Sequence, residues 1–272
     1  MYSNLPNNIV ATIREEVKKI KEEYRIINPL IRSDIFDILD KLCVVLRYPL
    51  DDDEEANGIH VERWVKGKKI DFVFINTSNT IEKQIYTAAH ELGHVWKIDE
   101  KVLAQVNEDI DSEAIINRFA AELLMPYDLF VRLFALKCTE HNISSGMVDD
   151  QILMKVIVFL MNVFMVPYKA VIYRMEEVEI IDIENRKELE KIEEENLDLI
   201  LNCIKSGDYQ NILKIDRQKS MSDLYNMLDK AEELELLSDT KLMRIRERFE
   251  YDKYLVEYKH NKGIAIKNIP KE

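Results

Sequence analysis

The five residues His90-Glu91-Leu92-Gly93-His94 carry the clearest chemical pattern in the sequence. Residues four positions apart lie on one face of an α-helix, so the imidazoles of His90 and His94 can bind the same metal ion. Glu91 can face a water bound to that ion and act as its general base. Together these groups suit zinc-dependent hydrolysis of a peptide bond. The alternative is a pair of helix-face histidines without a metal.

A catalytic zinc ion takes three protein ligands and leaves a fourth position for water. We predict Glu113 as the third ligand because it lies in the first turn of the next expected helix, and a helix positions a ligand more rigidly than a loop does. Glu108, Asp109 and Asp111, in the loop before that helix, are the competing candidates. We expect one Zn²⁺ ion, with Mn²⁺ as the alternative ion in the cell.

Other polar residues could assist this site. Asn117 follows Glu113 by four positions on the same helix face, so it could orient a ligand, or it could be an ordinary buried polar contact. Stabilising a developing oxyanion calls for a further donor. The sequence does not choose among four candidates for that donor, which are His60, Tyr86, Tyr127 and His141.

The elements that must position these residues follow from hydrophobic periodicity. We predict a helix over residues 82–98 and another over 112–125, separated by a polar loop. Small residues on both helices would let them approach closely. The segments 59–67 and 70–77 predict two strands of a hairpin just before the first helix. The small residues are Ala88, Ala89, Gly93, Ala114, Ala120 and Ala121.

The rest of the chain is predicted to be helical. Amphipathic patterns indicate helices over residues 7–24 and 35–46, the second capped by Ser33. Further helices are expected over 127–138, 150–165 and 167–178, followed by charge-dense helical sequence. We therefore predict an α+β fold: a zincin-like core with a small antiparallel-containing sheet beside the motif helix, then a helical C-terminal extension.

Acidic side chains outnumber basic ones by 51 to 38, which gives a formal net charge of -13. A broad grip on a nucleic-acid backbone needs clustered Lys and Arg, so direct nucleic-acid binding is not expected. Three scattered cysteines are typical of a reduced cytoplasmic protein. The first residues lack a secretory signal, and the most apolar segment, 152–166, is too short to cross a bilayer. We expect a cytoplasmic protein with no membrane segment.

Two paired motifs resemble those of the ImmA/IrrE family of cytoplasmic bacterial and phage metallopeptidases. The first is HELGH, within QIYTAAHELGH, and the second is E-x-x-x-N-R-F-A-A-E-L-L-M-P across residues 113–126. The later FMVPYKAVIYRM also fits, and Ile115-Ile116 departs from the family pattern. The resemblance covers about residues 30–175. It suggests an N-terminal helical lead at 1–29, a metallopeptidase domain at 30–175 and a helical region at 176–272.

The resemblance implies zinc ligands His90, His94 and Glu113, with Glu91 as the catalytic residue. It also implies a protein substrate, a DNA-binding helix-turn-helix repressor of a mobile element or stress regulon. A competing hypothesis is a non-proteolytic anti-repressor or sensor that binds the repressor through a metal-stabilised fold. In a third hypothesis the C-terminal helices gate the cleft. The oligomeric state is left open.

Overall fold

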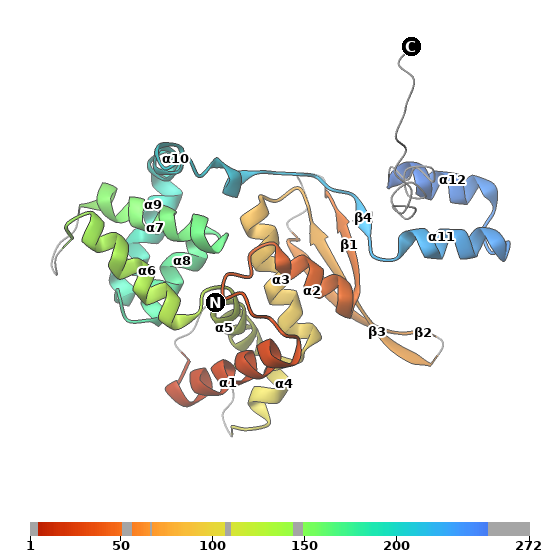
Figure 1. The fold of residues 1–272 in the computed structure, drawn as a ribbon, viewed down its shortest axis with the longest axis horizontal. Coiled ribbons are helices and arrows are strands. Elements are labelled where there is room, and N and C mark those ends of the chain that lie inside the picture. Colours follow the sequence, from red (N-terminus) through yellow and green to blue (C-terminus); the bar gives the residue numbers. More distant parts are fainter. Residues whose placement is uncertain (1–4, 51–55, 66, 107–109, 144–148, 250–272) are drawn as a thin grey trace, which may run out of the picture.

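The computed structural model describes residues 5–50, 56–65, 67–106, 110–143 and 149–249 (Figure 1). The elements run in the order α1 (Asn7–Glu23), α2 (Asp34–Leu42), β1 (Val44–Tyr48), β2 (Gly58–Val65), β3 (Lys68–Asn76), α3 (Ile81–Val95), α4 (Ile98–Leu103), α5 (Ser112–Leu124), α6 (Tyr127–Glu140), α7 (Asp150–Phe164), α8 (Tyr168–Glu177), α9 (Ile183–Glu195), α10 (Leu197–Ser206), the 3-10 helix η1 (Gln210–Leu213), β4 (Ser220–Met221), α11 (Leu224–Glu233) and α12 (Asp239–Arg248).

The sheet has the strand order β2-β3-β1-β4. Strands β2 and β3 form the predicted antiparallel hairpin, β1 pairs with β3 in parallel, and β4 pairs with β1 in antiparallel orientation. Helix α3 packs against β2 and β3, and α2 contacts β1 and α3. The predicted α+β class, with a small mixed sheet beside the motif helix and helices after it, is therefore confirmed.

The predicted helix over residues 35–46 is wrong beyond Leu42, where the chain turns into strand β1. A continuous apolar run such as Cys43–Leu46 fits an internal strand as well as a helix, and its β-branched residues favour the strand. Buried Arg47 fixes the junction: its Nη2 lies 2.8 Å from Asp40 Oδ2 on α2. The predicted helix over 82–98 is also divided, because Lys97 adopts a left-handed conformation (φ 53°) between α3 and α4.

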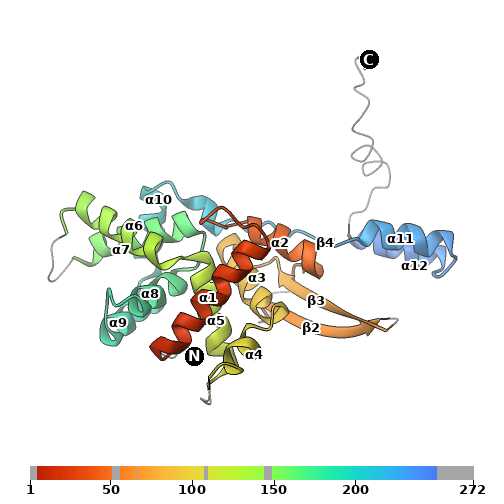
Figure 2. The ribbon, with the colours of Figure 1, turned by 60° about the horizontal axis from the view of Figure 1, so that its bottom comes forward.

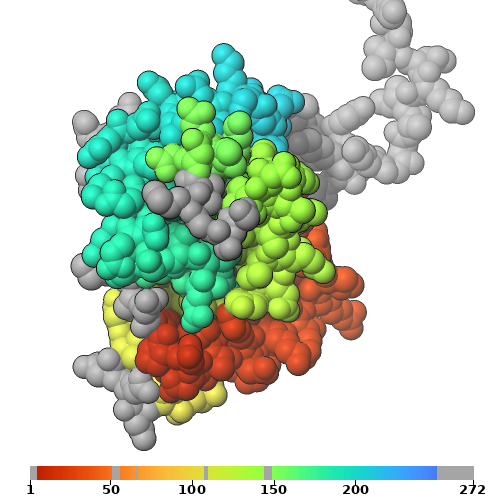
Figure 3. Space-filling model, turned by 90° about the vertical axis from the view of Figure 1, so that its left-hand side faces the viewer, coloured from red at the N-terminus to blue at the C-terminus, as the bar shows by residue number. Residues whose placement is uncertain are grey.

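One hydrophobic core joins most of the helices to the sheet. It includes Ile9 and Ile13 of α1, Val45 of β1 and Phe119 of α5, and it continues through Ile212 in η1. In Figure 3, α6 to α10 form one face of the molecule, with α1 below them. The core thus extends past residue 176, where the charge-dense sequence begins.

Helices α11 and α12 have a small apolar cluster of their own, built from Leu224, Leu228, Ala231 and Leu242. They lie beyond the sheet, on the side away from α6 to α10 (Figures 1 and 2). No single described helix is long and apolar enough to cross a membrane. Helices α7 and α8 reach the required length and hydropathy only when they are taken together. The chain bends by 104° between them, and both helices are largely buried.

A group of buried charges fastens α1, α5 and α8 together. We call it the Glu122 cluster: Arg14, Arg118, Glu122, Arg174 and Glu177. The Glu122 carboxylate accepts hydrogen bonds from Arg174 Nη2 at 2.7 Å, Arg118 Nη2 at 3.0 Å and Arg14 Nε at 2.9 Å. Arg174 is fully buried, and its Nε donates to the Met125 carbonyl at 3.1 Å.

The arginines determine the charge state of Glu122. Burial alone would raise the pKa of this carboxyl group. The charges and hydrogen bonds of Arg174, with Arg118 and Arg14, outweigh burial and lower the pKa to about 2. Glu122 is therefore ionised at neutral pH. Its ion pairs with Arg14 and Arg174 connect α5 to α1 and to α8.

Candidate metal centre

Helices α3 and α5 pack against each other and bring the two motif segments together. Gly93 permits this close approach, because a Cβ atom there would lie 3.0 Å from Phe119 Cδ1 and 3.1 Å from Ile116 Cγ2. At the start of α5, the Asp111 side chain accepts a hydrogen bond from the Glu113 backbone nitrogen at 3.2 Å. The predicted small residues on both helices are buried.

Three donor atoms converge where the helices meet. His90 Nε2 lies 3.3 Å from Glu113 Oε2, and His94 Nε2 lies 3.5 Å from Glu113 Oε1. The two Nε2 atoms are 3.2 Å apart. Bonds of about 2.0–2.1 Å to one zinc ion would place tetrahedral ligands about 3.3 Å apart. The spacing of these donors, all within 4.8 Å of one another, therefore fits a single ion.

The competing carboxylates do not join this group in the described part of the chain. Asp111 caps α5, and its side chain faces the Glu113 backbone. Glu108 and Asp109 lie outside the described residues.

Asn117 holds His90 in the form that a metal ligand requires. His90 Nδ1 lies 3.0 Å from Asn117 Oδ1, which can only accept a hydrogen bond, so Nδ1 carries the proton and Nε2 keeps its lone pair. Burial lowers the pKa of His90, and the nearby His94 lowers it further. Burial likewise lowers the pKa of His94. Both imidazoles are thus favoured in the neutral form, which binds metal.

Replacing Asn117 with Ala should weaken zinc binding by about 10- to 100-fold, because His90 loses the acceptor that fixes its ring and tautomer. Zinc affinity can be measured by competition with a chromophoric chelator. Asn117→Asp, which retains an acceptor oxygen, is the matched control and should bind zinc close to wild-type strength. Equal affinities in wild type and Asn117→Ala would show that Asn117 does not orient the ligand.

Glu91 lies buried between α3 and the start of β2. Burial, with a further contribution from the Glu113 carboxylate, raises the pKa of Glu91 to about 7. A Cβ atom on Gly58 would clash with Thr87 and would lie 2.8 Å from Glu91 Oε1. Only glycine lets β2 pass so close to this carboxylate. This role of Gly58 depends on the packing of β2 against α3, which the sequence does not reveal.

Strand β2 runs beside α3, and its alternate residues face the helix. His60 lies next to His94, with the rings stacked at a centroid distance of 6.2 Å, and His60 Nε2 lies 2.8 Å from Asp71 Oδ1. Two residues further on, Glu62 Oε1 lies 3.5 Å from Nζ of Lys97, which stands between α3 and α4. Of the four candidate donors, His60 is therefore the one whose ring stacks against a member of the His90–His94–Glu113 group.

The other three candidates have different surroundings. The Tyr86 hydroxyl donates to the Asn117 carbonyl at 3.4 Å, which links α3 to α5. Tyr127 begins α6, and its ring lies 4.7 Å from the Arg14 guanidinium carbon. His141 closes α6, which packs against α7.

This arrangement is typical of HExxH metallopeptidases. One helix bears two histidines and a buried glutamate, a second helix supplies a third donor, and a strand hairpin lies alongside. A peptidase family model, described as the IrrE N-terminal-like domain, matches residues 50–176. This match agrees with the family that the two motifs resemble, so the predicted resemblance to the ImmA/IrrE family is confirmed. Neither curated proteins nor solved structures yield a match to this chain.

Proposed function

We propose that this protein is a zinc-dependent endopeptidase that cleaves a cytoplasmic helix-turn-helix repressor. The observation that carries the proposal is the convergence of His90, His94 and Glu113 at tetrahedral spacing, next to the buried Glu91. The metallopeptidase domain over residues 50–176 supports the same reaction class.

Each residue of the centre has a distinct task in this proposal. Neutral His90 and His94, with the Glu113 carboxylate, would hold the ion. A zinc ion bound there would polarise the scissile carbonyl and acidify the attacking water. Glu91, whose pKa is about 7, would take the proton from that water on a carboxylate oxygen and pass it to the leaving amine. Asn117 would keep the His90 ring in place.

The substrate backbone would bind beside β2. This strand stands at the end of the described sheet and pairs with β3 alone. An extended peptide could therefore add to its free edge by backbone hydrogen bonds, next to His60 and Glu91. The net charge of -13 favours encounter with a basic partner, and DNA-binding repressors are often basic.

The test is to mix the protein with the product of the neighbouring regulator gene and to map any fragments by mass spectrometry. With zinc present, discrete fragments should appear, and prior treatment with a chelator should abolish them. A stable complex without fragments would instead favour the non-proteolytic anti-repressor. Cleavage that persists after complete metal removal would refute the metallopeptidase mechanism.

A further inference from the structure

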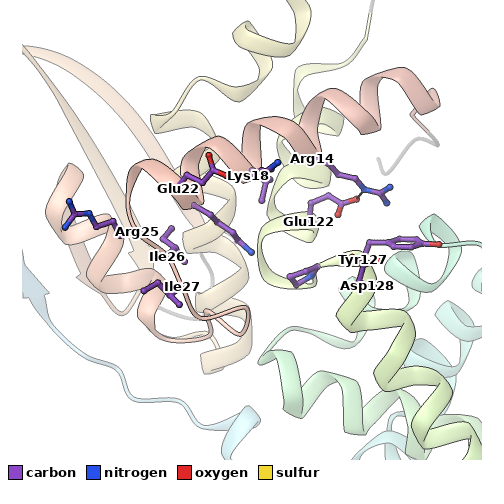
Figure 4. Close-up of a pocket in the computed structure, with 12 residues that line it drawn as sticks. Arg14, Lys18, Glu22, Arg25, Ile26, Ile27, Glu122, Tyr127 and Asp128 are labelled. Carbon is purple, nitrogen blue, oxygen red and sulfur yellow. Dashed lines mark hydrogen bonds and ion pairs between the residues drawn. The ribbon is translucent and has the colours of Figure 1, made fainter.

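A cavity of about 670 Å³ lies between α1, the turn that follows it and the junction of α5 with α6. Figure 4 shows Arg14, Lys18 and Glu22 along α1. Arg25, Ile26 and Ile27 follow at the turn after α1, and Tyr127 and Asp128 lie at the start of α6. Neither the metal-binding residues nor Glu91 line this cavity. Its volume lies within the range of about 300–1,000 Å³ that is usual for small-molecule sites.

Cationic residues slightly outnumber acidic ones around the cavity of this strongly acidic protein. The cationic residues are Arg14, Lys18, Lys21 and Arg25, and the acidic ones are Glu22, Glu122 and Asp128. Arg14 and Glu122 pair with each other in the Glu122 cluster. Of the other charged residues that line the cavity, Lys21 alone is not exposed.

Lys21 is the most informative of these cations. Its side chain is half-buried, and within the described part of the chain its ammonium has neither an ion pair nor a hydrogen bond. Burial lowers the pKa of Lys21, against the opposing charge of Glu122. A partly desolvated cation that has no ion pair among the described residues is costly, and an anion in the cavity would reduce that cost.

The rest of the lining is apolar. Val17, Ile26, Ile27 and Pro126 contribute aliphatic surface, and the Tyr127 ring packs under Arg14. Ile27 is 92% exposed and Tyr127 is 41% exposed, so both are accessible to a ligand at the mouth of the cavity. A ligand that contacts both the cationic and the apolar lining of the cavity needs an acidic group and an apolar body.

We propose that this cavity, named here the α1 pocket, binds a small amphipathic organic acid, with its acidic group at Lys21 and Lys18 and its apolar body against Ile26, Ile27 and Tyr127. The acidic group would be a carboxylate, sulfonate or phosphate. The site needs neither a metal ion nor Glu91, so it stands apart from the proposed peptidase reaction.

Fluorescence titration of the full chain tests this proposal, with anilinonaphthalene sulfonate as the anionic probe and N-phenylnaphthylamine as its uncharged counterpart. The anionic probe should bind more tightly than the uncharged one. Lys21→Met should raise the Kd of the anionic probe about tenfold, as expected for the loss of about 1.4 kcal/mol. The same change should leave the uncharged probe unaffected. Lys18→Met provides a second, independent variant with the same expected direction.

Lys19→Met is the matched control, because Lys19 lies on the same helix outside the pocket and its ammonium pairs with Glu16 at 2.7 Å. It should leave the Kd of the anionic probe unchanged. The proposal is overturned if the anionic probe does not bind, or if the uncharged probe binds equally well. It is also overturned if Lys21→Met and Lys18→Met bind the anionic probe like wild type, or no more weakly than Lys19→Met does.

Discussion

Glu91→Gln should lower the rate of repressor cleavage by at least about 100-fold while zinc remains bound. Glutamine matches the size of the buried glutamate and fits under Gly58, but it cannot take a proton from water. The three proposed ligands are unchanged, so the zinc content should stay near one ion per chain. The measurements are the initial rate of fragment formation and the metal content by atomic emission.

Two further variants make this result specific. Glu100→Gln, on the exposed surface of α4, removes a nearby carboxylate that pairs with Lys97, and it should cleave like wild type. His90→Ala should lose both zinc and cleavage, because it removes a proposed ligand. Full activity of the Glu91→Gln variant would rule out Glu91 as the general base.

Glu122→Gln should lower the free energy of unfolding at pH 7 by about 3–5 kcal/mol, the usual effect of breaking a buried ion pair. Among the described residues, the change leaves the fully buried Arg174 with Glu177 as its one anionic partner, and it weakens the connection between α1, α5 and α8. Urea unfolding followed by circular dichroism measures the effect. Glu188→Gln, which breaks an exposed pair with Lys191, is the control and should leave the midpoint unchanged.

The same pair of proteins should respond differently to acid. In the folded protein the pKa of Glu122 is lowered to about 2, whereas in an unfolded chain a glutamate has a pKa of about 4.3. Its ionised form therefore stabilises the fold above about pH 4.3, and this stabilisation is lost as the pH falls towards 2. The stability difference between wild type and Glu122→Gln should shrink over that range. A constant difference from pH 7 to pH 2 would contradict the charge-based explanation.

The convergence of His90, His94 and Glu113 was predictable because its signals are local. Helical spacing alone places His90 and His94 on one face, and the position of Glu113 in the next helix suggests its return to that face. The hairpin before α3 was predictable for the same reason, since alternation and turn residues occur within one short segment.

The features that the sequence did not reveal depend on distant partners. Strand β1 is an apolar run whose strand conformation comes from pairing with β3, and β4 has only two residues. His60 became distinct from the other candidate donors only when the β2–α3 packing placed it beside His94. The Glu122 cluster joins three helices, and no local pattern marks Arg174 as the buried partner of Glu122.

The C-terminal region divides at η1, and this affects how the gating hypothesis can be tested. Helices α9 and α10 belong to the main core. Deleting residues 180–272 would therefore disrupt the core of the protein as well as remove the proposed gate. Helices α11 and α12 form their own cluster, and Arg248 Nε donates to the Tyr48 hydroxyl of β1 at 3.2 Å. The gating hypothesis therefore concerns α11 and α12.

The two outer strands of the sheet also bear on self-association. The strand order makes β2 and β4 the two edges of the described sheet, and β2 spans eight residues whereas β4 spans only two. A long edge strand offers a row of unpaired backbone groups to another chain, whereas a very short one offers few. Edge-to-edge association of this protein should therefore run through β2, and a peptide bound along β2 would block it.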